Sequence, residues 1–130
     1  MTAETTVETY YAALRAGDPL HPFFDLDEST VKFGIGERLV GEEIEEGLRE
    51  QIRTTREWTV ESHALRVTER DDTAWFSDQV RMAWIDDEDE RHDHETRWSG
   101  TLVRRGPDEA EGIDADWRFV GMHVSVPGEA

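Results

Sequence analysis

The first part of the chain contains two stretches with the hydrophobic period of an amphipathic helix. In residues 4–16 the apolar positions Val7, Tyr10, Tyr11 and Leu14 have helical spacing, and Gly17 and Pro19 follow as helix terminators. In residues 41–55 Ile44, Leu48 and Ile52 share one face, with glutamates in the first turn and arginine in the last, which suits the helix dipole. The sequence therefore predicts two substantial helices. A short helical turn or ordered loop around residue 22 and a short strand at 31–35 are expected between them.

After the second helix the hydrophobic period changes from 3.6 to 2. Four runs rich in Trp, Val, Thr and Phe then predict strands, at 58–69, 73–85, 92–105 and 117–126. They are joined by a tight turn at 70–72, a charged turn at 86–91 and a longer loop at 106–116. Helices followed by hairpin-linked strands predict one α+β domain over residues 1–130, with a strongly curved, mostly antiparallel sheet packed on the helices.

Composition narrows the function classes. Asp plus Glu number 31 against 14 Lys plus Arg, for a formal charge of −17, which disfavours nucleic acid and anionic membranes as partners. There is no cysteine, no apolar run of membrane-spanning length and no basic, apolar leader, so a cytoplasmic protein is expected. Lys32 is the single lysine. This composition resembles that of proteins from salt-accumulating archaea, and an ordinary acidic mesophilic domain is the alternative.

The closing run 116–127 carries a family resemblance. The strand within it opens with Trp117, continues with apolar residues and ends in the pattern His-x-Ser, at His123 and Ser125. Weaker matches are the helix end at 12–18, Phe33-Gly34 with Gly41 opening the next helix, and Arg97-Trp98-Ser99. Together these motifs resemble the nuclear transport factor 2-like superfamily, nearest its SnoaL-like branch. The resemblance implies a cone-shaped α+β barrel whose bent sheet wraps a pocket, and a homodimer formed through the outer sheet face.

The superfamily resemblance does not fix an activity, because this fold hosts isomerases, cyclases, dehydratases, transport factors and assembly hubs. Ketosteroid isomerase uses a carboxylate base with a tyrosine and a neutral aspartic acid that stabilise the oxyanion. Laid along this sequence, the tyrosine falls on Tyr10. The base and the acid fall near Phe33 and Gly100, which cannot perform those roles. Transfer of that isomerase chemistry is therefore disfavoured.

Two residues are candidate acid–base catalysts. Asp78 is the single charge on an otherwise apolar face of the strand 73–85, where burial would raise the pKa of its carboxyl group. A structural ion pair with a neighbouring arginine, or the opposite face assignment, is the alternative. His123 shares its strand face with Phe119, Gly121 and Ser125, opposite the oilier face that should meet the helices. It is therefore expected at a dimer interface, and a catalytic role would need the reverse facing.

Other polar and aromatic groups are weaker candidates. Trp98 could roof an apolar ligand or simply fill the core, and Arg97 could bind a ligand carboxylate or pair with an acid. His92 and His94 point the same way on a strand and could hold a metal, but a solvated hairpin end is favoured and no metal site is assigned.

The sequence thus predicts a small homodimeric pocket protein that binds an apolar or mixed small molecule without a cofactor. The pocket candidates are Tyr10, Phe33, Asp78, Trp98 and Met122. An isomerase, cyclase or hydratase-like enzyme that uses Asp78 or His123 is the first alternative. A dimeric association module is the second.

Overall fold

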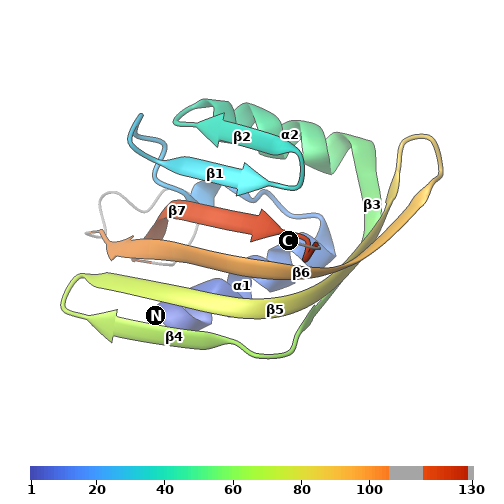
Figure 1. Ribbon diagram of the computed structural model, residues 1–130. Helices are drawn as coiled ribbons and strands as arrows, with labels where there is room; N and C mark the ends of the chain where they lie inside the picture. The colour runs from blue at the N-terminus through green and yellow to red at the C-terminus, as the bar shows by residue number, and fades with distance from the viewer. Residues whose placement is uncertain (106–115, 129–130) are drawn as a thin grey trace.

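The computed structural model describes residues 1–105 and 116–128, and its elements follow the predicted order. Two helices and a 3-10 turn lie in the first half, and most of the sheet follows them (Figure 1). The elements are α1 (Ala3–Ala16), η1 (His21–Phe23), β1 (Val31–Gly34), β2 (Glu37–Val40), α2 (Glu43–Thr54), β3 (Thr55–Ser62), β4 (Arg66–Arg70), β5 (Thr73–Asp86), β6 (Arg91–Arg104) and β7 (Trp117–Ser125).

Capping interactions define both ends of helix α1. Thr2 and Thr5 form a reciprocal capping box, in which each side chain accepts a hydrogen bond from the other residue's backbone N–H. At the other end Gly17 adopts a left-handed conformation with φ 73°, and the backbone N–H of Asp18 donates to the carbonyl of Ala13. The helix is thereby fixed at both ends, and it presents its apolar stripe to the sheet.

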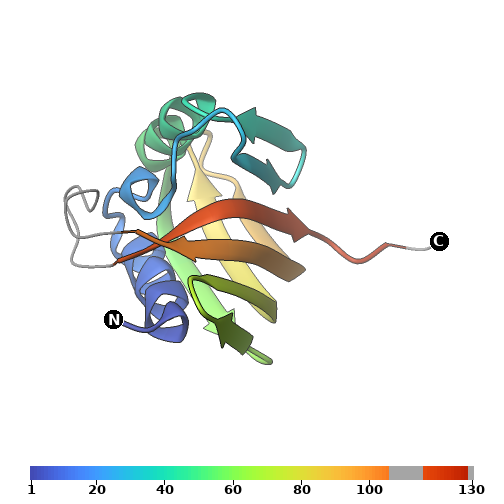
Figure 2. The same cartoon turned by 90° about the vertical axis from the view of Figure 1, so that its left-hand side faces the viewer.

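The sheet is mixed and strongly curved. Its strand order is β2-β1-β7-β6-β5-β3, with β4 also paired to β5. Among the described strands all pairs are antiparallel except β1 with β7, which run parallel. Figure 2 shows the sheet bending around one side of the molecule, with α1 and α2 on its concave side. The expected α+β cone is confirmed, as an open sheet rather than a closed barrel.

Three details differ from the sequence prediction. The segment 37–40 forms an additional strand, β2, that completes a hairpin with β1 around Gly36, whose φ is 75°. The run 58–69 divides into β3 and β4.

The third difference is a β-bulge in β7. Thr101 of β6 pairs with Gly121 and Leu102 of β6 pairs with Phe119, so Val120 is an extra residue in β7. The bulge turns Phe119 into the core, whereas alternation had placed it beside His123. The loop predicted at 106–116 lies almost entirely outside the described residues.

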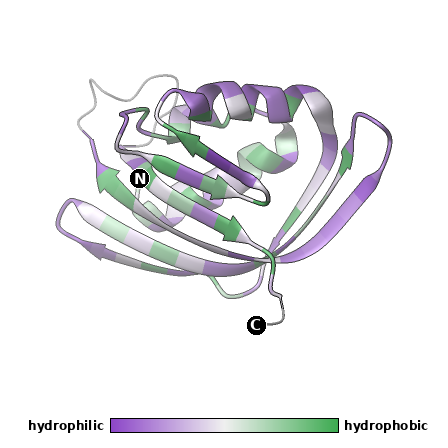
Figure 3. Cartoon of the chain, turned by 45° about the horizontal axis from the view of Figure 1, so that its top comes forward, coloured by the Kyte–Doolittle hydropathy of each residue, from purple (hydrophilic) through white to green (hydrophobic). Residues whose placement is uncertain are grey.

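The core lies between the concave sheet face and the helices. Along β5 every second side chain is buried from Ala74 to Met82, as the alternation predicts. Figure 3 shows the corresponding alternation of hydrophobic and hydrophilic residues along the sheet, and a largely hydrophilic α2. Within the described part of the chain, neither helix has the length and apolar character needed to cross a membrane.

Candidate functional site

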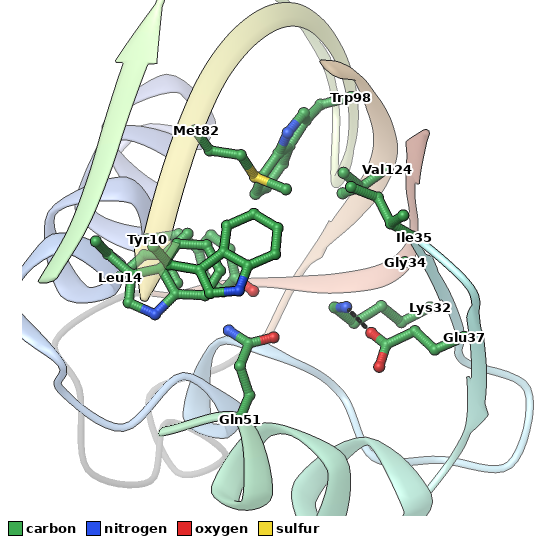
Figure 4. Close-up of a pocket in the computed structure, with 12 residues that line it drawn as sticks. Tyr10, Leu14, Lys32, Gly34, Ile35, Glu37, Gln51, Met82, Trp98 and Val124 are labelled. Carbon is green, nitrogen blue, oxygen red and sulfur yellow. Dashed lines mark hydrogen bonds and ion pairs between the residues drawn. The ribbon is translucent and has the colours of Figure 1, made fainter. Parts of the chain in front are cut away.

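A cavity of about 120 Å³ lies on the concave side of the sheet, partly open to solvent. Helices α1 and α2 contribute to it together with strands β1, β2, β3, β5, β6 and β7 and the β1–β2 turn (Figure 4). The lining residues are Tyr10, Leu14, Lys32, Gly34, Ile35, Glu37, Gln51, Trp58, Met82, Trp84, Trp98 and Val124. The lining is thus mostly apolar and aromatic, with a few polar side chains, which is the usual composition of a small-molecule site.

A β-bulge in β3 builds one aromatic wall. Arg56 pairs with Ile85 and Thr59 with Ala83, so Glu57 and Trp58 together lie opposite Trp84. Glu57 takes a positive φ of 57°, and the Trp58 ring stacks on Trp84 with centroids 4.6 Å apart and planes 17° apart. The local backbone irregularity therefore produces a flat, rigid indole pair at the cavity.

Tyr10 and Trp98 form a second aromatic contact. Tyr10 is 2% exposed, and its ring packs edge-to-face against Trp98 at 6.2 Å and Phe119 at 5.3 Å. The Trp98 indole N–H donates to the Thr96 hydroxyl at 2.9 Å, which fixes the ring. Within residues 1–105 and 116–128 the Tyr10 hydroxyl has no hydrogen-bond partner. Burial, and secondarily the charge of Glu37, raise the pKa of Tyr10, so its phenol stays protonated and can donate to a ligand.

An ion pair supplies the polar end of the cavity. The Lys32 ammonium donates to Glu37 Oε1 at 2.5 Å, and Lys32 is only 5% exposed. The Glu37 side chain is 36% exposed and lies across Gly34, its partner in the β1–β2 register. A Cβ at Gly34 would overlap the Glu37 carboxylate, so the glycine makes room for this pair.

Two further lining residues carry hydrogen-bond donors. The Gln51 side chain reaches into the cavity from α2, toward the Lys32–Glu37 end (Figure 4). Neither its amide nor the Trp84 indole N–H has a hydrogen-bond partner in the described part of the chain. The arrangement can therefore hold a flat ring against indoles and hydrogen-bond its polar substituent, with donors in the majority.

Asp78, a predicted pocket residue, does not line this cavity. It is 4% exposed and lies beneath α1, where it accepts hydrogen bonds from the Tyr11 hydroxyl at 2.9 Å, the Ser62 hydroxyl at 2.6 Å and the Ala64 backbone N–H at 2.9 Å. The expected burial of Asp78 is correct, but neutral donors satisfy its carboxylate, and Tyr11 is the tyrosine among them. This geometry is that of a structural anchor between α1 and the sheet.

Three other predicted residues also lie away from the lining, and only Tyr10 and Trp98 belong to it. Phe33 and His123 are exposed on the outer sheet face, where their rings pack at 5.4 Å on neighbouring strands. His123 therefore has the outward facing that alternation favoured. Met122 is buried on the core side of β7 without reaching the cavity.

The structure adds Lys32, Glu37, Gln51 and the Trp58–Trp84 pair to the candidate site. The sequence analysis missed Lys32 because an apolar Val31 and Phe33 flank it, so alternation suggested that the lysine points outward. In the structure Phe33 is 41% exposed and Lys32 is buried. The usable signal was that the single lysine of the chain lies inside a strand.

The exposed β5–β6 hairpin carries a second cluster of polar groups. Ligand atoms of Asp86, Glu90 and His92 lie within 4.8 Å of one another, and His92 contacts Asp86 at 2.8 Å. The hydrogen bond from His92, with backbone N–H groups in support, lowers the pKa of Asp86. The His92 ring also stacks on Trp84 at 5.0 Å.

Solved structures of other proteins share this fold. Nuclear transport factor 2-like proteins from Salmonella enterica and from Rhodospirillum rubrum each superpose with a TM-score of 0.77 at 16% identity. The superposition covers 97% of this chain and 89% of the Salmonella chain, and 98% and 100% for the Rhodospirillum protein, which is described as of unknown function in nutrient uptake. A ketosteroid isomerase-like protein from Erwinia carotovora superposes with a TM-score of 0.71 at 14% identity, covering 97% of this chain and 94% of that chain.

At sequence identities of 14% and 16%, these superpositions establish the fold alone. No functionally curated protein matches the sequence significantly. The model of the SnoaL-like domain matches residues 3–129. The chain therefore belongs to the SnoaL-like domain family, and it has the fold of the nuclear transport factor 2-like proteins.

Proposed function

We propose that this protein binds a small, single-ring ligand in the cone between the curved sheet and the helices. The observation that carries the proposal is the hydroxyl of Tyr10, a residue that lines the aromatic cavity; this hydroxyl has no hydrogen-bond partner in the described part of the chain. A ligand acceptor at this position would form one hydrogen bond, with a net contribution of about 0.5–1.5 kcal/mol.

The size of the cavity supports one ring rather than a larger scaffold. Its volume is about 120 Å³, and a dry engineered cavity of about 150 Å³ accommodates benzene. Drug-sized ligands occupy roughly 300–1,000 Å³. Because the cavity is partly open beside Ile35, a substituent can extend toward solvent.

Binding is better supported than acid–base catalysis by the predicted groups. Asp78 is saturated by its own hydrogen bonds, and His123 lies on the opposite side of the sheet from the cavity. Of the lining groups in the described residues, only Glu37 is a carboxylate, and Lys32 already holds it. The enzyme alternative therefore lacks a free base among the residues that the sequence analysis assigned to it.

The proposal is tested with phenol, benzamide and cyclohexanone as probes, by saturation-transfer NMR and thermal shift on the full chain. We expect at least one ring to bind and to stabilise the fold. Ile35→Trp fills the mouth of the cavity from an exposed turn and should abolish that binding. Val126→Trp, also from an exposed position but outside the lining, is the matched control and should retain it. Absence of any ring binding, or equal loss in both variants, rejects the proposal.

A further inference from the structure

The only lysine of the chain is a buried cation at the polar end of the cavity. Lys32 is 5% exposed on β1, between β2 and β7, so the surrounding strands fix the position of its ammonium group. Within the described residues it is the single basic side chain of the lining. A desolvated ammonium is costly unless an anion pairs with it, so this position demands a counter-ion.

Glu37 supplies that counter-ion from a more exposed position. It follows the tight Ile35–Gly36 turn at the start of β2, and its side chain is 36% exposed while that of Lys32 is 6% exposed. Within the described residues, Lys32 is the only hydrogen-bond and ion-pair partner of its carboxylate. The Glu37 side chain therefore already borders solvent, whereas that of Lys32 is buried.

The donors around this pair outnumber the acceptors. Tyr10 and Trp84 each present a donor without a partner in the described chain, Gln51 adds an amide, and Lys32 keeps two N–H groups beyond its bond to Glu37. Tyr10 and Glu37 both line the cavity, and the charge of Glu37 contributes to the raised pKa of Tyr10. A planar anion would be bound there by an ammonium and a phenol, with its ring against the aromatic side chains of the lining.

We propose that the preferred ligand is a single-ring carboxylate, which competes with Glu37 for the Lys32 ammonium. This inference rests on the proposed function and specifies its ligand class. In the unliganded protein Glu37 takes the place of the ligand carboxylate. Ligand binding returns Glu37 to water and leaves the Lys32 charge compensated, so no net charge is buried.

Three isosteric probes separate charge from shape: benzoate, benzamide and benzamidinium, which carry negative, zero and positive charge on nearly the same framework. Dissociation constants are measured by NMR titration at pH 7 and low salt. We expect benzoate to bind about tenfold more tightly than benzamide, and benzamidinium to bind most weakly. Added salt should weaken benzoate binding more than benzamide binding.

The direction in which Glu37→Gln changes the benzoate affinity decides the inference. It keeps the side-chain shape but removes the competing charge, so benzoate affinity should rise about tenfold while benzamide affinity changes little. Glu46→Gln, on the exposed surface of α2 and outside the lining, makes the same change in net charge and is the matched control. Lys32→Met should remove the preference for benzoate. Should that variant not fold, the Glu37→Gln result still decides.

The outcomes distinguish the two proposals. Equal affinity for all three probes, or a preference for benzamidinium that Glu37→Gln abolishes, overturns the carboxylate inference and leaves ring binding intact. Loss of benzoate affinity in Glu37→Gln also overturns it. If none of these three probes binds, and neither phenol nor cyclohexanone binds, the proposed function itself fails, and the carboxylate inference fails with it.

Discussion

The Tyr11 hydroxyl donates to Asp78 Oδ2 at 2.9 Å, and this buried bond ties α1 to β5. Tyr10, the preceding residue, faces the cavity from the same helix with its hydroxyl unpaired in the described chain. Successive positions on a helix are about 100° apart, so adjacent tyrosines reach different neighbours. One phenol thus belongs to the scaffold and the other to the candidate site.

This division predicts opposite effects for two matched variants. Tyr11→Phe removes a hydrogen bond to a buried carboxylate and should lower the free energy of unfolding by about 1.5–3 kcal/mol. Tyr10→Phe removes a hydroxyl without a protein partner and should change it by less than about 0.5 kcal/mol, while weakening ring binding. Urea denaturation measures the first quantity and NMR titration the second. Equal destabilisation by both variants would contradict the assignment.

Alkaline pH should destabilise the fold through both tyrosines. Burial raises the pKa of Tyr10 and of Tyr11, and the carboxylate of Asp78 raises that of Tyr11 further. The folded protein therefore holds these protons more tightly than the unfolded chain, whose tyrosines titrate near pH 10. Their contribution is fully present below about pH 9. Above about pH 10 it falls by up to about 1.4 kcal/mol per pH unit for each tyrosine.

Ultraviolet absorbance checks this alkaline effect. Tyrosinate absorbance near 295 nm should appear only together with the loss of far-ultraviolet circular dichroism. The chain unfolded in urea should titrate near pH 10 and serves as the reference. Tyrosinate formation near pH 10 in the folded protein would show that the two phenols are accessible.

The outer sheet face predicts a homodimer, as the family resemblance implies. Phe33 is 41% exposed there and packs against His123, and Trp75 on β5 is 44% exposed. Light scattering after size exclusion should give twice the 15.0 kDa chain mass. Phe33→Glu should shift the protein toward monomer because it places a charge in an apolar interface. Val126→Glu, at a similarly exposed residue in the C-terminal segment, should not. A monomeric wild type at tens of micromolar would refute this expectation.

Salt should stabilise the protein. With a formal charge of −17 the folded state repels itself, and the Debye length falls from about 30 Å at 0.01 M to about 3 Å at 1 M salt. Thermal melting in KCl should show a rising midpoint, with much of the rise below 1 M. Adaptation to a salt-rich cytoplasm is the proposal that this series tests, and a constant midpoint would count against it.

Much of the fold could be predicted because hydrophobic period and terminators act locally. The stripe that includes Val7 and Leu14, with Gly17 after it, determines α1, and the alternation from Ala74 to Met82 determines the buried face of β5. That alternation correctly buried Asp78. It could not reveal the partners of the carboxylate, because Tyr11, Ser62 and Ala64 come from separate segments that only tertiary packing brings together.

The candidate site was harder to predict, because it depends on two β-bulges and on which face of β1 points inward. The bulge at Glu57 sets Trp58 against Trp84, and the one at Val120 turns Phe119 inward. Each depends on a single residue of register, which shifts side chains to the opposite face. In β1, Lys32 is buried toward the pocket and Phe33 is exposed on the outer sheet face. The local pattern of apolar and polar residues shows neither the pocket nor the outer face, so it could not predict this facing.

Lys32 is the only lysine of the sequence, so its side-chain amine is the only one in the chain. That amine lies at the cavity. Acylating reagents therefore have one lysine to modify, and the rate of its modification reports on access to the interior. An occupied cavity would shield this nitrogen, so amine labelling followed by mass spectrometry can serve as an occupancy assay even while the guest is unidentified.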